Sequence, residues 1–192
     1  MLRRAVIGTL YLASLSIAPT HAWAEGTLEA DLAQCWSCHG KDGRSSDSTM
    51  PVIWGQTADY IVKQLNDYRD GGRENQIMSS MAESIPRSKL ADAAKIISLK
   101  PWPQLDAPVS KAPLPDLAQA CTACHGADLM GAMTDAGPAP RLAGQNERYL
   151  VEQMQAFATG LRANQDTMTA IMRGIDTGQR EALARQVAHY AP

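Results

Sequence analysis

Apolar residues recur at the spacing of an α-helix in three stretches of the first half of the chain, and again at corresponding places in the second half. In the first half they are Leu28, Leu32 and Cys35, then Ile61, Leu65 and Tyr68, then Leu90, Ala94 and Ile97. In the second half they are Leu114, Leu117 and Cys121, then Leu150, Met154 and Phe157, then Leu183, Val187 and Tyr190. Residues three or four positions apart share one face of a helix, and no run of alternating β-branched residues competes with this pattern. We therefore predict an all-α fold with three helices in each half.

The polar residues indicate that the two halves are copies of one unit. The shared series is Pro51, Gly55, Gln56, Tyr60, Gln64, Gly71, Arg73 and Asn75 in the first half, and Pro140, Gly144, Gln145, Tyr149, Gln153, Gly160, Arg162 and Asn164 in the second, each displaced by 89 positions. Prolines crowd the stretch over 101–115, which favours a stiff, extended linker between the copies. We therefore predict one domain over residues 25–102, a linker over 103–113 and a second domain over 114–192.

The first residues have the pattern of a secretory signal peptide. Arg3 and Arg4 precede an apolar run over residues 5–18, and Ala22 and Ala24 supply the small residues of a cleavage site. We expect residues 1–24 to be removed and the mature chain to be periplasmic. An uncleaved membrane anchor is disfavoured because the run is short and interrupted by polar residues, and we expect no membrane span in the mature chain.

The charge of the mature chain argues against nucleic acid as a partner. Loss of Arg3 and Arg4 leaves 16 of the 18 basic residues against 20 acidic ones, a formal charge of −4. Acidic and basic residues are interleaved along the chain, so there is no basic stripe that could follow a phosphate backbone.

The four cysteines form two identical motifs, Cys-x-x-Cys-His followed by glycine. The motifs contain Cys35, Cys38 and His39, and Cys121, Cys124 and His125. Two thiols at this spacing can each form a thioether to a haem vinyl group while the imidazole binds the iron. A redox dithiol would need a βαβ setting, a zinc ribbon would need a loop shorter than the 83 positions between the motifs, and plain disulfides would leave both histidines unexplained. We therefore predict two covalently attached haem c groups.

The repeat predicts which residue lies on the opposite side of each iron. His189 is the single histidine outside the motifs in the mature chain, so at most one haem could have two histidine ligands and methionine is the expected partner. Met78 and Met168 lie three and four residues after the repeated asparagine, so they correspond once one inserted residue is allowed. Met81 and Met172 lack matching partners and remain the alternatives.

These motifs resemble those of the two-domain, dihaem class I cytochromes c, the cytochrome c4 type, over nearly the whole mature chain. Each domain of that family runs from a haem site through a Pro-x-Leu-x-Gly-Gln stretch and a tyrosine-containing helix ending in Gly-x-Arg to a methionine ligand and a closing helix. The resemblance implies that His39 and His125 are axial iron ligands, with Met78 and Met168 opposite them. It also implies that the two haems lie near a shared interface.

The resemblance gives roles to further repeated residues. It implies that the carbonyls of Pro51 and Pro140 accept a hydrogen bond from the axial histidines, and such bonds orient the ring and tune the metal. A role as turn formers alone is the alternative for these prolines. Arg73 and Arg162 could contact haem propionates, or they could be ordinary exposed arginines at helix ends.

Histidine and methionine ligands leave no iron position for a substrate, and this pair raises the reduction potential. We therefore expect a one-electron carrier, not an enzyme, that links a redox donor to an acceptor such as a terminal oxidase. The alternative is the cytochrome subunit of a periplasmic dehydrogenase, and flavocytochrome sulfide dehydrogenases, whose partner is a flavoprotein, contain a subunit of this kind. A haem peroxidase is disfavoured because the sequence supplies no evident distal acid or base.

Overall fold

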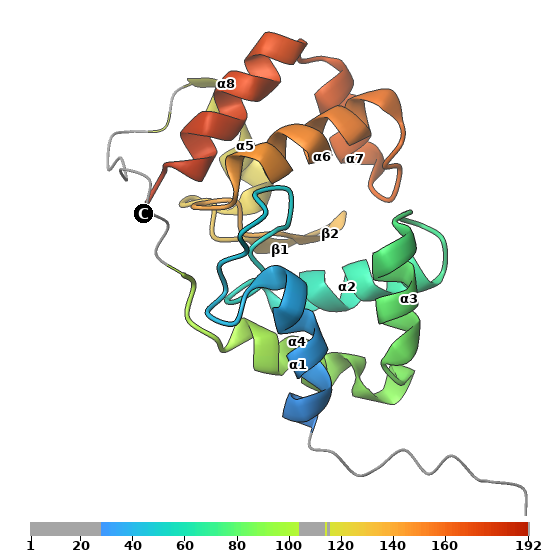
Figure 1. Cartoon of the computed structure of the whole chain (residues 1–192). Helices are drawn as coiled ribbons and strands as arrows, with labels where there is room; N and C mark the ends of the chain where they lie inside the picture. Colours follow the sequence, from blue (N-terminus) through green and yellow to red (C-terminus); the bar gives the residue numbers. More distant parts are fainter. Residues whose placement is uncertain (1–27, 104–113, 115, 192) are drawn as a thin grey trace, which may run out of the picture.

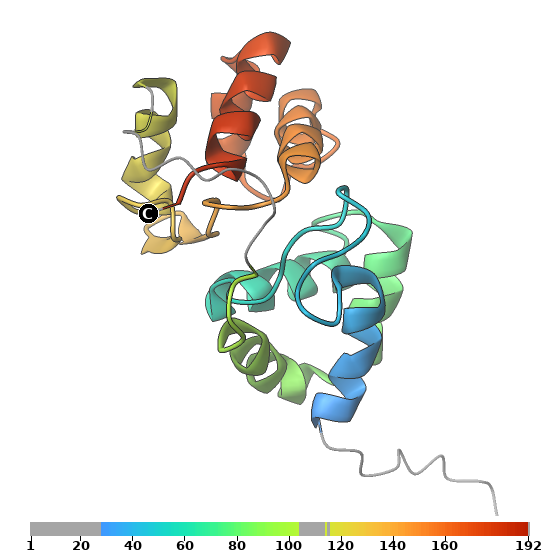
Figure 2. The same ribbon diagram turned by 60° about the vertical axis from the view of Figure 1, so that its left-hand side comes forward.

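The computed structural model describes residues 28–103, 114 and 116–191. The predicted signal peptide over residues 1–24 lies outside the described residues, as does nearly all of the predicted linker over 103–113, so both stay predictions. Figures 1 and 2 show two helical units side by side, the first running from blue to green and the second from yellow to red. No helix in the described part is long and apolar enough to cross a membrane.

The first unit is built around one central helix. Its elements are α1 (Leu28–His39), α2 (Ala58–Arg69), α3 (Gln76–Ser84), the 3-10 turn η1 (Arg87–Lys89) and α4 (Leu90–Ser98). Helix α2 packs against both α3 and α4, and α4 also contacts α1. The core joins Leu32 of α1 to Ile61 and Leu65 of α2 and to Ala93 and Ile97 of α4.

The second unit repeats this arrangement and adds a small hairpin. Its elements are α5 (Asp116–His125), β1 (Ala132–Thr134), β2 (Gly137–Ala139), α6 (Glu147–Thr159), α7 (Asp166–Arg173) and α8 (Thr177–Ala188). The antiparallel β1–β2 hairpin lies between His125 and Pro140, where the second copy has three extra residues. Apart from this hairpin the described fold is all-α, as predicted.

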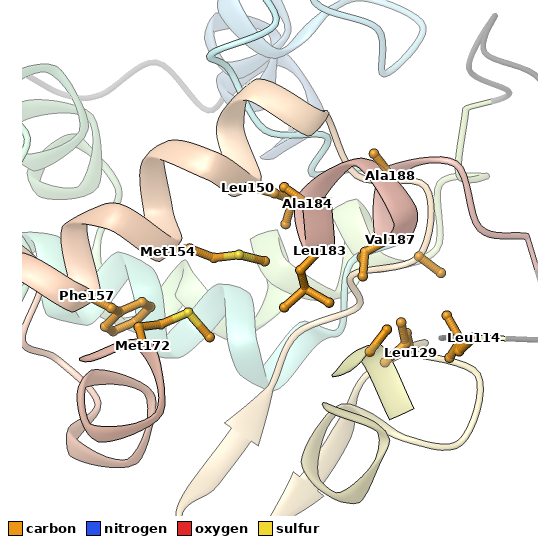
Figure 3. Packing of buried hydrophobic residues seen from close by; sticks show 12 residues of the cluster. Leu114, Leu129, Leu150, Met154, Phe157, Met172, Leu183, Ala184, Val187 and Ala188 are labelled. Carbon is orange, nitrogen blue, oxygen red and sulfur yellow. The ribbon is translucent and has the colours of Figure 1, made fainter. Parts of the chain in front are cut away.

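Figure 3 shows the core of the second unit, where α6 and α8 face each other. Leu150, Met154 and Phe157 are the buried residues of α6, and they belong to one cluster with Leu183 and Val187 of α8. These are the residues whose helical spacing the sequence displays. Each unit therefore has an apolar cluster of its own, which agrees with a duplicated domain.

Helices α3 and α7 were missed by the sequence analysis, which expected three helices in each copy. They have nine and eight residues, and each buries a single apolar side chain completely, Ala82 in α3 and Met172 in α7. Their apolar residues do follow a helical spacing, Met78, Met81 and Ala82 in α3 and Met168, Ile171 and Met172 in α7, but these positions were interpreted only as candidate iron ligands and their equivalents. Side chains at their N-termini mark where they begin, because Asn75 accepts a hydrogen bond from the backbone of Met78 and Gln165 accepts one from the backbone of Thr167.

We predict that Gly40, which follows the first haem motif, cannot be replaced by alanine without a large loss of stability. Gly40 has φ +93°, and a Cβ there would lie 2.0 Å from the backbone oxygen of Arg44. Gly71 has φ +78° but no atom within 4 Å of such a Cβ, so Gly71→Ala should cost only the left-handed backbone penalty of about 1–2 kcal/mol. Chemical unfolding of the two variants, followed by circular dichroism, would contradict this account if the two losses were equal.

Candidate haem sites and the interface between them

Each Cys-x-x-Cys-His motif occupies the last turn of a helix, at the end of α1 in the first unit and of α5 in the second. No disulfide joins the four cysteines in the described structure; Cys38 and Cys124 are exposed, while Cys35 and Cys121 are half-buried. Burial raises the pKa of the Cys35 and Cys121 thiols, so neither is activated as a thiolate. The arrangement suits thioether attachment better than it suits a redox dithiol.

The two motif histidines are buried, and a backbone carbonyl sets the tautomer of each. The Nδ1 atom of His39 lies 2.9 Å from the carbonyl oxygen of Pro51, and that of His125 lies 2.9 Å from the carbonyl oxygen of Pro140. Since a carbonyl only accepts, Nδ1 must carry the proton and donate. Burial lowers the pKa of both imidazoles and favours the neutral form. Each ring therefore keeps the lone pair on Nε2, which is the form that binds iron.

Met78 and Met168 occupy equivalent positions in the two units. Each is the third residue of its helix, α3 or α7, and each is half-buried against the apolar cluster of its own unit. The inserted residue that the repeat required lies just before the start of α7. Both side chains therefore lie at the edge of the apolar cluster and are not enclosed in it. This is the position expected of a methionine that binds the iron of a haem.

The alternative methionines have different surroundings. Met172 is 2% exposed and packs within the second core, and its equivalent in the first unit is the fully buried Ala82. The equivalent of Met81 is Ile171, which is 43% exposed. Met172 is thus a core residue, and neither alternative recurs as methionine in both units.

Two glutamines join the units through reciprocal hydrogen bonds that sequence reasoning did not assign. The side-chain amide of Gln145 accepts from the backbone N–H of Val52 at 2.8 Å and donates to its carbonyl at 2.9 Å. The amide of Gln56 does the same with Arg141, at 2.7 Å and 3.0 Å. The recurrence of Gly-Gln at a displacement of 89 was the available signal, but nothing in the sequence says that the contacts cross between copies.

The repeated arginines also lie in this interface. Arg73 and Arg162 are 8% and 7% exposed, so the interpretation of exposed arginines at helix ends is wrong. Arg73 donates to Gln64 at 2.7 Å and to Gln153 at 2.6 Å, and Arg162 donates to the same two oxygens at 2.9 Å and 2.8 Å. Two guanidinium groups and two amide oxygens thus form a closed ring across the interface, and contact with haem propionates stays a prediction.

Two tyrosines complete this ring, again in a crossed arrangement. Arg73 donates to the hydroxyl of Tyr149 at 3.1 Å, and Arg162 donates to the hydroxyl of Tyr60 at 3.0 Å. Burial alone would raise the pKa of Tyr149, but Arg73 and Arg162 outweigh it and lower that pKa. The phenol oxygen therefore offsets part of the positive charge that the two arginines bring into the interface.

The donor set in each unit fits a covalently bound haem. Two cysteines that form no disulfide lie at the end of one helix, the histidine beside them is neutral with Nε2 available, and a half-buried methionine recurs at one position in both units. In the described residues, no group of three or more histidine, cysteine, aspartate or glutamate side chains offers a different metal site. Fold and site together define a c-type cytochrome with two haem sites.

Comparisons with known proteins identify the family. The model of the cytochrome c family matches residues 116–188. Cytochrome c4 of Pseudomonas aeruginosa is 33% identical over 157 residues, which are 77% of each chain, and the thiosulfate dehydrogenase electron acceptor of Stutzerimonas stutzeri is 28% identical over 184 residues, covering 87% of this chain and 83% of that protein. The structure of Acidithiobacillus ferrooxidans cytochrome c4 has a TM-score of 0.71 at 27% identity, over 82% of this chain and 99% of that one.

The chain therefore belongs to the cytochrome c4 family. It is a dihaem electron-transfer protein with two covalently attached haem c groups, as the two cysteine motifs predicted. Its cytochrome c4 relatives are electron carriers and not enzymes.

We predict that Met172→Ala lowers the free energy of unfolding by about 2–5 kcal/mol, because it opens a cavity in the second core. The neighbouring variant Ile171→Ala changes a side chain that is 43% exposed and should cost about 0.5 kcal/mol. The methionine-to-iron charge-transfer band of the oxidised protein should be intact in both. A weaker band in Met172→Ala would instead identify Met172 as a ligand, since the first-domain haem alone would still contribute to it.

Proposed function

We propose that the chain is a periplasmic carrier that moves single electrons between redox proteins, with His39 and Met78 as axial ligands in the first domain and His125 and Met168 in the second. In this proposal Cys35, Cys38, Cys121 and Cys124 attach the two haems. The observation that carries it is the equivalent placement of Met78 and Met168 at the third residue of α3 and α7, since a ligand needed twice should recur.

The protein's contribution to this chemistry is to hold two ligand sets in place. When bound, each haem takes up and releases one electron at its iron. Pro51 and Pro140 hold the imidazole rings by accepting from Nδ1, and the cores of the two units hold α3 and α7, which present the methionines. Two protein ligands per iron leave no coordination position for a substrate, so the described residues support electron transfer and not turnover.

Export to the periplasm is part of the proposal. It is supported by the signal pattern over residues 1–24 and by the use of all four cysteines in haem attachment motifs. Covalent haem also suits domains this small, because a unit of about 80 residues buries limited apolar surface and gains from a covalently held core group.

The ligand assignment is tested by carbon monoxide, which binds reduced haem iron only where a position is open. We predict that the unmutated protein with both haems binds none, and that Met168→Ala binds one equivalent per chain. The volume-conserving variant Met172→Leu is the matched control and should bind none. Uptake by the unmutated protein would show an open iron and favour an enzyme of the peroxidase kind.

A second candidate function is to accept electrons from a sulfur-compound dehydrogenase. The likeness to the thiosulfate dehydrogenase electron acceptor, which extends over 87% of this chain, favours it over a flavoprotein partner. We predict that a purified thiosulfate dehydrogenase with thiosulfate reduces the oxidised protein much faster than thiosulfate alone does. Reduction no faster than that of an unrelated single-haem cytochrome c would argue against this partner.

A further inference from the structure

A single peptide group joins the first haem site to the second unit. The carbonyl of Pro51 and the N–H of Val52 belong to one planar amide, whose carbonyl and N–H are coupled by resonance. Its oxygen accepts from Nδ1 of His39 at 2.9 Å, and its N–H donates to Oε1 of Gln145 at 2.8 Å. A continuous hydrogen-bonded path therefore runs from Gln145, in the second unit, to the imidazole of the first.

The same path exists in the opposite direction. The carbonyl of Pro140 accepts from Nδ1 of His125 at 2.9 Å, and the N–H of Arg141, in the same peptide group, donates to Oε1 of Gln56 at 2.7 Å. In each unit, the peptide group that accepts from the haem-site histidine also donates to a glutamine of the other unit.

The environment of the two glutamines makes these bonds strong and directional. Gln56 and Gln145 are 4% and 3% exposed, so water does not compete for the amides. Each Oε1 also accepts the N–H of the next residue in its own chain segment, Thr57 or Asn146, at 2.9 Å. With two N–H donors at the oxygen and a carbonyl opposite Nε2, only one orientation of each amide satisfies all partners.

We propose that Gln145 and Gln56 are cross-domain positioning residues, each of which tunes the axial histidine of the other domain through the intervening peptide group. Donation by the Val52 N–H to Gln145 increases the negative charge on the Pro51 oxygen, because hydrogen bonds in a chain polarise one another. A more negative acceptor draws the Nδ1 proton of His39 more strongly and makes Nε2 a better donor to iron. That stabilises the oxidised state and lowers the reduction potential.

The inference rests on the proposed ligation by His39 and His125. Its consequence is that the reduction potential of each haem depends on a glutamine of the other domain. Removing a glutamine from one domain should alter the potential of the haem in the other. A purely structural role would disturb the domain that contains the glutamine at least as much, since Gln145 directly precedes α6 and the interface would loosen on both sides.

The test is the variant Gln145→Met, which has similar volume but no acceptor for the Val52 N–H, with both haems bound. The potentials of the two haems would be measured by spectroelectrochemistry and assigned by NMR. We expect the reduction potential of the first-domain haem to rise, and that of the second-domain haem to change less. Gln56→Met should give the reverse pattern, with the larger upward shift at the second-domain haem.

Asn146→Ala is the matched control. The side chain of Asn146 donates across the same interface to the carbonyl of Met50 at 2.5 Å, forms no cap for α6 and takes no part in the peptide path. The backbone N–H of residue 146, which donates to Gln145, is kept in the alanine variant. Both potentials should stay close to those of the unmutated protein. A shift of the first haem as large as that in Gln145→Met, or a shift confined to the second haem in Gln145→Met, would overturn the proposal.

If Gln145→Met does not bind both haems, Gln145→Glu at pH 8 decides the question, because a carboxylate still accepts from the Val52 N–H and polarises it more. The first-domain potential should then fall below that of the unmutated protein; an unchanged or higher value would overturn the proposal. Failure of the ligation itself is read separately, from carbon monoxide binding by the unmutated protein.

Discussion

In both units the buried histidine of the haem motif donates from Nδ1 to a proline carbonyl at 2.9 Å. This hydrogen bond fixes the tautomer and the orientation of the buried imidazole, so Nε2 already has the position in which it can bind the iron. The carbonyl can serve only if its own peptide is held still. That peptide is held by a glutamine of the other unit, so the two haem sites and the interface form one hydrogen-bonded assembly.

The interface is polar, and its directional hydrogen bonds restrict the relative position of the two units. Two buried arginines would repel each other, and burying charge is costly unless it is matched by hydrogen bonds. Here the guanidinium groups share the oxygens of Gln64 and Gln153, and each also donates to a tyrosine hydroxyl. Because these bonds are directional, the units have one favoured relative position. Such a fixed geometry suits electron transfer between two haem groups, since the domains do not have to find each other before each transfer.

Several of the repeated residues make contacts between the two units and not within one of them. Gln56, Gln64 and Arg73 each bond to a residue of the opposite unit, and their equivalents 89 positions later, Gln145, Gln153 and Arg162, make the corresponding bonds back. Such a reciprocal pair of contacts needs the side chain that bonds across the interface to be present in both copies. The residues that pack within a unit are freer to differ, as Ala82 and Met172 do at equivalent core positions.

The amino-acid sequence was enough to predict the all-α fold, the haem attachment sites and the duplicated organisation, because these depend on local spacing: the helical period, the Cys-x-x-Cys-His motif and a constant displacement between the copies. It also indicated Met78 and Met168 through their recurrence. The helices α3 and α7 were not predicted, because their methionines were interpreted as candidate iron ligands and not as a helical pattern. The burial of Arg73 and Arg162 was not predicted either. The bonds of the repeated glutamines, tyrosines and arginines across the interface became visible only in the folded chain, because a repeated residue has the same local pattern whether its partner lies in its own copy or in the other one.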